Sequence, residues 1–271
     1  MFKRIMLAFA LFAPLCASAY TTTYYPKGVT LAHVHHAPQI KIFWDIHGVL
    51  GQKDGAARFG AVMGNLFTLG ASKMGDDKSW NEISKIKKEA DISGEAYMHV
   101  LTKNGNPDAA RAAEEVANAY KPRKGMQEIV QKLNAAGHTQ QLASNIGPRC
   151  FENLKRKFSK NKDGRFIFEI IKPGKIVDYS KYGNGSIRTD INPIHLSPVA
   201  KPHGQFFRDL QKTFNPDGKF LMIMIDDRME NIHSAVNEGF VSIHMDIGRD
   251  HPVRELNQEL ERLQLFKPRK V

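Results

Sequence analysis

The chain has 271 residues, of which 42% are hydrophobic and 25% charged, and its formal net charge is +11 at pH 7. This length suits one large domain that carries an insertion. The positive charge favours anionic partners such as phosphate esters, lipopolysaccharide, nucleic acid or an acidic membrane face, without choosing among them. The two cysteines exclude an intramolecular disulfide if Cys16 is removed with an N-terminal signal, because Cys150 is then alone.

Residues 1–19 have the layout of a cleavable secretory signal. Lys3 and Arg4 precede an apolar run, and small residues stand at positions 17 and 19. The apolar run is too short to span a bilayer comfortably, so an uncleaved anchor is the weaker alternative. We therefore expect an exported protein, periplasmic or secreted, with no stable membrane span after cleavage.

From Gln39 onward, apolar strand-like runs alternate with amphipathic helical patterns, which is typical of an α/β fold with a mainly parallel sheet. Apolar residues recur at helical spacing from Met126 to Leu133, after Pro202, around Ile232 and in the last segment. We therefore predict a Rossmann-like sheet with helices on both faces. The predicted strands are IKIFWD (40–45), TQQLAS (139–144), RFIFEII (165–171), KFLMIMID (219–226) and FVSIHM (240–245).

Residues 54–120 differ from the rest because they contain several helical stretches and no strand-like run. One stretch is opened by Ser79 with Glu82 three residues later, a capping-box pattern. We predict a helical insertion over residues 54–120, with the α/β core formed by residues 20–53 and 121–271. A second helical stretch of the insertion runs through Ala109, Ala112, Ala113, Val116 and Tyr120.

Two further segments are polar. Residues 172–200 are rich in Gly, Pro, Asn and Asp and predict a long irregular connection, of a kind that often has a function. Residues 153–165 concentrate six Lys and Arg residues with little aromatic interleaving, which favours a solvated loop over a single-strand nucleic-acid site. We expect no specific nucleic-acid partner.

Polar side chains follow the predicted strands where each strand ends. In open parallel sheets, ligands bind outside the carboxyl ends of the strands, so these side chains are expected to share one crevice. Three carboxylates so close together would repel one another, and some would take up protons unless a cation neutralised them. Oxygen ligands with a partly open shell suit Mg²⁺, which tends to keep water and to bind substrate phosphate. The residues concerned are Asp45, Ser144, Asn145, Asp226, Asp227 and, just before the Pro202 helix, Lys201.

This ordered set resembles the four motifs of the haloacid dehalogenase (HAD) superfamily, which appear here as WDIHGVL, LASN, KP and MIDDRMEN. The resemblance covers roughly residues 39–53 and 121–246, and the insertion after the first motif matches the position of that family's helical cap. It implies that Asp45 is the nucleophile that accepts a phosphoryl group as an aspartyl phosphate. Ser144 and Asn145 would bind the substrate, and Lys201 would neutralise charge and hold Asp45 ionised.

The resemblance also implies a Mg²⁺ site. Asp45, the backbone carbonyl of His47 and Asp227 would bind the metal directly, while Asp226 and Asn231 would support the site through water or hydrogen bonds. Covalent catalysis then splits one difficult displacement into two steps, and the metal and the ammonium stabilise the charge on the transferring oxygens. The expected substrate is a phosphorylated small molecule or a phosphoprotein.

His47 departs from the family pattern, because phosphatases of this kind usually have a second aspartate there as general acid and base. One hypothesis is that the imidazole, with an ordinary pKa of about 6.5, replaces that aspartate and the protein remains a phosphatase. Another is that hydrolysis is lost and the protein is a binding or interaction module. A third, carbon–halogen hydrolysis, is disfavoured because that branch works without metal and leaves Asp226 and Asp227 unexplained.

Overall fold

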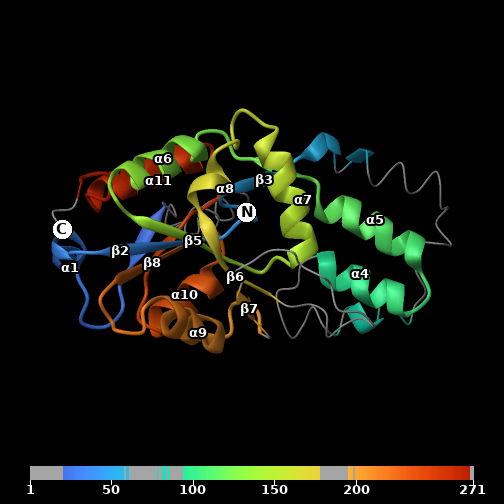
Figure 1. Ribbon diagram of the computed structural model, residues 1–271, viewed down its shortest axis with the longest axis horizontal. Helices are drawn as coiled ribbons and strands as arrows, with labels where there is room; N and C mark the ends of the chain where they lie inside the picture. The colour runs from blue at the N-terminus through green and yellow to red at the C-terminus, as the bar shows by residue number, and fades with distance from the viewer. Residues whose placement is uncertain are drawn as a thin grey trace, which may run out of the picture.

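The computed structural model describes residues 21–57, 59–60, 78, 81–83, 85, 94–177, 195–197 and 199–268. Its main element is a seven-stranded sheet in the order β1-β9-β8-β2-β5-β6-β7, drawn in Figure 1. Every neighbouring pair is parallel except β1 with β9. The strands are β1 (Thr22–Tyr24), β2 (Ile40–Trp44), β5 (Thr139–Ser144), β6 (Lys172–Val177), β7 (His195–Ser197), β8 (Leu221–Asp226) and β9 (Val241–His244).

β2 lies at the centre of the sheet and pairs with two parallel neighbours. Trp44 is level with Ile225 of β8 on one side and with Leu142 of β5 on the other. Because the three strands run the same way, their carboxyl ends meet at one edge of the sheet. The first motif therefore lies between the second and the fourth.

Alternation along the strands divides the core between the two faces of the sheet. Ile42 and Trp44 belong to a cluster that includes residues of the helices α6 and α11, whereas Phe43 belongs to a second cluster with residues of α9 and α10. Figure 1 shows the two helix pairs on opposite sides of the strands. The helices are α1 (Leu31–His36), α4 (Gly94–Lys103), α5 (Pro107–Ala117), α6 (Met126–Ala135), α7 (Pro148–Ser159), α8 (Ile167–Ile170), α9 (Gly204–Phe214), α10 (Met229–Asn237) and α11 (Pro252–Arg262).

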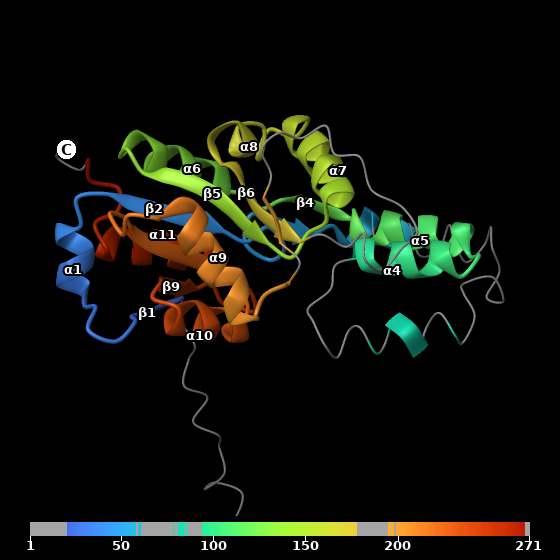
Figure 2. The same ribbon diagram turned by 60° about the horizontal axis from the view of Figure 1, so that its bottom comes forward.

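A short two-stranded ribbon connects the core to the helical insertion. β3 (Gly51–Lys53) pairs antiparallel with β4 (Tyr120–Pro122), and Lys53 is level with Tyr120. The segment that leaves the core therefore lies beside the segment that returns to it. Beyond the ribbon, α4 and α5 pack against each other at one end of the molecule, as Figure 2 shows.

The sheet and its helices confirm the predicted α/β class, and four of the five predicted strands are present with small changes at their ends. The domain boundaries stay a prediction, although α4 and α5 lie within residues 54–120. The predicted helix that would reach Tyr120 ends at Ala117, and Tyr120 opens β4 instead. Ser79, which the capping-box pattern singled out, lies outside the described residues.

The fifth predicted strand, residues 165–171, is wrong. Ile167–Ile170 form the helix α8, because Ile167 and Ile171 are four residues apart and both are buried against the core. The strand begins at Lys172, inside the stretch predicted to be irregular. The register of β5 and β6 shifts between Gln141 and Ala143, which accommodates a proline and a glycine in β6.

Within the described part of the chain, no helix is long and apolar enough to cross a membrane. Residues 1–19, the predicted secretory signal, lie outside the described residues. Export and the periplasmic or secreted location therefore stay predictions.

Candidate active site

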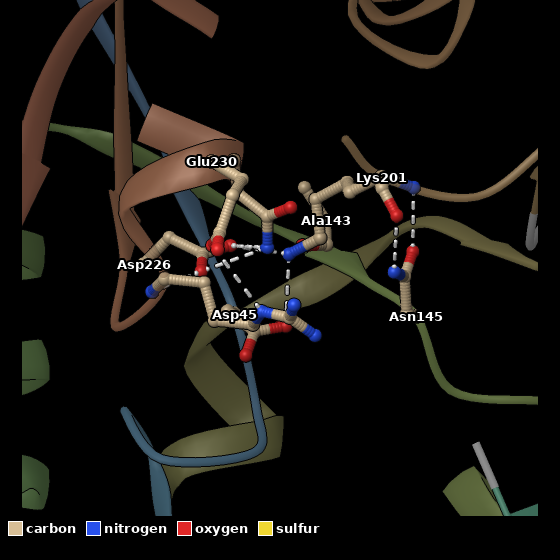
Figure 3. A network of polar contacts seen from close by, with 8 residues as sticks. Asp45, Ala143, Asn145, Lys201, Asp226 and Glu230 are labelled. Carbon is tan, nitrogen blue, oxygen red and sulfur yellow. Dashed lines mark hydrogen bonds and ion pairs between the residues drawn. The ribbon is translucent and has the colours of Figure 1, made fainter. Parts of the chain in front are cut away.

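Lys201 lies at the centre of the site and joins the three strand ends. Its Nζ donates hydrogen bonds to Asp45 Oδ1 at 2.9 Å, to Asp226 Oδ2 at 2.6 Å and to the carbonyl oxygen of Ala143 at 2.8 Å. Asp45 directly follows β2, Asp226 ends β8 and Ala143 belongs to β5. Figure 3 shows the ammonium between the two carboxylates. The predicted nucleophile and the predicted cation are thus in direct contact.

Asn145 fixes the backbone from which the lysine projects. Its side-chain nitrogen donates to the carbonyl oxygen of Lys201 at 2.8 Å, and its Oδ1 accepts from the backbone nitrogen of Lys201 at 2.8 Å (Figure 3). The side-chain amide is therefore engaged with Lys201 on both of its polar ends. This geometry gives Asn145 a positioning role, and its predicted contact with a substrate stays a prediction.

The two aspartates of the fourth motif have different surroundings. Both oxygens of Asp226 accept hydrogen bonds from Asn231, at 3.0 and 3.1 Å, and Oδ1 also accepts from the backbone nitrogen of Arg228 at 2.9 Å. Asp227 instead lies against Gly48 in the loop after β2. A Cβ added at Gly48 would come within 2.0 Å of Asp227 Oδ2, and this glycine has a φ of 89°. The loop must therefore have glycine here, both for its backbone and for the carboxylate beside it.

The electrostatics of the cluster follow from this crowding. Burial, and then the negative charges of Asp45 and Asp226, raise the pKa of Asp227 to about 8. Burial likewise raises the pKa of Asp226, against the opposing effect of Lys201. Burial by itself lowers the pKa of Lys201, but the charges of Asp226 and Asp45 outweigh it and raise that pKa above its ordinary value. One ammonium therefore does not balance three carboxylates.

The cluster fits a divalent cation. Asp45, Asp226 and Asp227 each offer a carboxylate oxygen, and these oxygens lie within 4.8 Å of one another. Lys201 and Asn231 already donate hydrogen bonds to Asp226. The raised pKa of Asp227 indicates that its negative charge is poorly compensated by the groups around it. A hard cation held by Asp45 and Asp227 would supply that compensation, and Mg²⁺ prefers such oxygen ligands.

Ser144 is fully buried at the end of β5, and its Oγ has no hydrogen-bond partner among the described residues. A buried hydroxyl without a partner is costly, so such groups call for an explanation. Its neighbour Ala143 accepts from Lys201, which places the residue beside the carboxylate cluster. A phosphoryl oxygen bound at this site would give the hydroxyl an acceptor.

His47 is half-buried in the loop between β2 and β3. Its imidazole packs on the ring of Tyr120, with the ring centroids 4.6 Å apart and the planes tilted by 50°. Nη2 of Arg123 donates to the carbonyl oxygen of Gly48 at 2.7 Å. Sequence reasoning did not select Tyr120 or Arg123, although both stand where the chain re-enters the core and therefore come back beside the first motif.

A scan against protein-family models gives no match, and a search of curated proteins finds no significant relative. Among solved structures, a HAD family enzyme from Bacteroides thetaiotaomicron is 15% identical over 78% of this chain and 96% of its own, with a TM-score of 0.51. A predicted HAD-like family hydrolase from Porphyromonas gingivalis is 15% identical over 83% of this chain and 98% of its own, with a TM-score of 0.50. The chain therefore has the fold of the haloacid dehalogenase family.

Proposed function

We propose that this protein is an exported, Mg²⁺-dependent phosphatase that hydrolyses a phosphate monoester through an aspartyl phosphate on Asp45. One observation carries the proposal: a buried lysine holds Asp45 beside two further carboxylates at the carboxyl ends of two neighbouring parallel strands. The residue types and their positions match what phosphoryl transfer requires, namely a nucleophile, a fixed cation and a set of metal ligands. Export rests on the signal-like residues 1–19.

In the first step, Asp45 attacks the phosphorus atom, and the bond between phosphorus and the ester oxygen breaks. Because Lys201 donates to Oδ1 of Asp45, the attack is assigned to Oδ2. The leaving oxygen takes a proton from the imidazolium of His47 and departs as an alcohol. Ser144 donates to one of the phosphoryl oxygens during the transfer.

In the second step, water attacks the phosphorus atom of the aspartyl phosphate and gives its proton to the now neutral imidazole. The bond between phosphorus and Asp45 breaks, so that inorganic phosphate leaves and the carboxylate is restored. Mg²⁺, held by Asp45, Asp227 and the carbonyl of His47, would stabilise the negative charge of the transferring oxygens. The substrate is a phosphorylated small molecule or a phosphoprotein, in accordance with the basic net charge.

The test is release of phosphate from para-nitrophenyl phosphate, measured with Mg²⁺ and with a chelator. We expect turnover with Mg²⁺ and none with the chelator, and we expect Asp45→Asn to abolish turnover. Asp217→Asn is the matched control, because Asp217 forms an exposed ion pair with Lys219 at 3.2 Å and should leave turnover unchanged. Absence of turnover in the wild-type protein across metals and pH would refute the proposal.

His47 also supports a second candidate, a binding protein that retains the site without hydrolysis. The variant His47→Asp restores the residue that phosphatases of this kind usually have. A large gain in rate, together with tight binding of phosphate but no turnover by the wild type, would favour the binding protein. A loss of rate would show that the imidazole is the working acid and base.

A further inference from the structure

Two side chains in or directly after β4 contact the loop between β2 and β3, which carries His47 and Gly48. Tyr120, the first residue of β4, packs on the imidazole of His47. Arg123, the residue after β4, donates its Nη2 to the carbonyl oxygen of Gly48 at 2.7 Å. Both contacts therefore come from the four residues that bring the chain back from the insertion.

The contact with Tyr120 constrains the ring of His47. A tilted pair of rings at a centroid distance of 4.6 Å lies in the range where aromatic side chains attract each other. Both rings are only half-buried, so surrounding core residues do not enclose the imidazole on every side. The ring of Tyr120 thus packs on the imidazole of His47 from the ribbon.

The contact with Arg123 constrains the backbone that carries this ring. The backbone nitrogen of Arg123 also donates to the carbonyl oxygen of Leu50 at 2.9 Å, so one residue binds the loop at two carbonyls. Within the loop, Gly48 donates to Gly51 at 2.9 Å and Gly51 donates to Ile46 at 2.8 Å. These bonds fix the backbone that carries the imidazole of His47.

We propose that Tyr120 is a positioning residue, which holds the imidazole of His47 in the orientation that proton transfer needs. This inference rests on the proposed phosphatase function. Because Lys53 and Tyr120 pair directly, any movement of the insertion that shifts the ribbon also shifts the ring that orients His47. The positions of Lys53 and Tyr120, where the chain leaves and re-enters the core, are thereby linked to proton transfer through one side chain.

The test compares Tyr120→Leu with Tyr120→Phe on two substrates. An alkyl phosphate needs a general acid to protonate its leaving oxygen, whereas the leaving group of para-nitrophenyl phosphate departs without one. General acid–base catalysis contributes about 10²–10⁴-fold, so misplacing the imidazole is expected to lower kcat on the alkyl ester by about 10-fold or more. The KM should change little, and the first-turnover burst of nitrophenol should persist. Tyr120→Phe keeps the ring and should restore kcat.

Lys121→Ala is the matched control, because Lys121 is on the same strand, is exposed and pairs with Asp54 at 3.9 Å. It should leave kcat on both substrates unchanged. The proposal is overturned if Tyr120→Leu keeps the wild-type kcat on the alkyl ester. It is also overturned if both substrates lose rate equally and Tyr120→Phe does not restore it, because that pattern indicates general damage to the fold.

A separate readout distinguishes failure of this inference from failure of the proposed function. If the wild-type protein hydrolyses neither substrate, the phosphatase proposal fails. The ring signals of His47 in an NMR spectrum at one fixed pH then decide the positioning role. They should move in Tyr120→Leu, stay in place in Tyr120→Phe and Lys121→Ala, and show ring-to-ring contact with Tyr120 in the wild type. Unmoved signals in Tyr120→Leu would refute the role.

Discussion

Replacement of Lys201 by methionine tests the electrostatic account of the site most directly. The methionine has a similar length but no charge and no donor, so the packing is largely kept while three hydrogen bonds are lost. Two of those bonds are ion pairs, at 2.9 Å to Asp45 and 2.6 Å to Asp226, and all the side chains involved are at least 92% buried. The change leaves negative charge buried without its partner.

The expected cost follows from that burial. Removing one member of a buried ion pair costs about 3–5 kcal/mol, because the charge that remains is neither solvated nor paired. The cost should depend on pH, since burial raises the pKa of Asp226 and Lys201 lowers it. Without Lys201 that pKa rises further. A carboxylic acid whose pKa is raised by folding stabilises the protein at low pH, and this contribution is lost as the pH rises. The stability lost in Lys201→Met should therefore be largest at pH 7 and become smaller towards pH 4.

The assay is urea denaturation of the metal-free protein in a chelator, followed by fluorescence. Trp44 is a suitable probe because it is fully buried beside the site in sequence and donates to Gln140 at 3.1 Å. Lys41→Met is the matched control. Lys41 is also buried, but its Nζ donates to the carbonyl oxygen of Phe214 at 2.6 Å and lies 3.9 Å from the ring centroid of Phe220.

The control should lose about 1–3 kcal/mol, with the same loss at pH 5 and pH 7, because burial lowers the pKa of Lys41 from a value far above this range. A loss below about 1 kcal/mol in Lys201→Met, or a loss that does not shrink on acidification, would refute the reasoning. Either result would mean that water reaches the carboxylates or that they are already protonated.

Three further predictions concern the metal and the phosphate. Because folding raises the pKa of Asp227 to about 8, the free energy of unfolding in a chelator should fall from pH 4 to pH 8, by at most about 1.4 kcal/mol per pH unit. Urea denaturation measures this slope, which should vanish in Mg²⁺ and become smaller in Asp227→Asn. Gly48→Ala should weaken Mg²⁺ binding about 10- to 100-fold by calorimetry, whereas Gly28→Ala, with a φ of 82° and nothing within 4 Å, should only cost about 1 kcal/mol of stability. Ser144→Ala should weaken phosphate binding while its stability changes by less than about 1 kcal/mol, because its Oγ has no hydrogen-bond partner to lose among the described residues. A large loss of stability would contradict this.

The central strands β2 and β8 could be predicted because they are mainly apolar on both faces, whereas β5 is more polar and is expected from its place between a helix and a turn. In β2, Ile42 and Trp44 face one cluster of the core and Phe43 the other, and Lys41 is the one polar position of the strand. The residues that follow these strands could then be placed at one edge, and the structure does bring Asp45, Asp226 and Lys201 into contact.

β6 could not be predicted, because the signals that mark it are those of a turn. Pro173 removes a donor and Gly174 lacks a side chain, yet both stand in the strand. A Cβ at Gly174 would lie 1.9 Å from the carbonyl oxygen of Leu142, so the close approach of β5 requires glycine. The apolar run before β6 has the composition of a strand, but a run this short fits one turn of helix equally well, and Ile167–Ile170 form α8.

The contacts that Tyr120 and Arg123 make with the loop after β2 also could not be predicted from the sequence. Nothing in the types of Tyr120 or Arg123 distinguishes them from surface residues. Their roles arise from the pairing of Gly51 with Pro122, which brings residues about 70 positions apart against the same loop. Pairings of that separation leave no local pattern in a single sequence.

The strand β1 has a consequence for how molecules of this protein meet one another. It lies antiparallel along β9, with Thr22 level with His244 and Tyr24 level with Ser242, and so occupies the hydrogen-bonding groups on that side of β9. A bare strand margin of this kind invites pairing with a second chain. With β1 in place, the edge of the sheet is a strand of only three residues, which offers a second chain little to pair with. Removal of β1 would expose the longer β9 as the edge, and is expected to favour self-association.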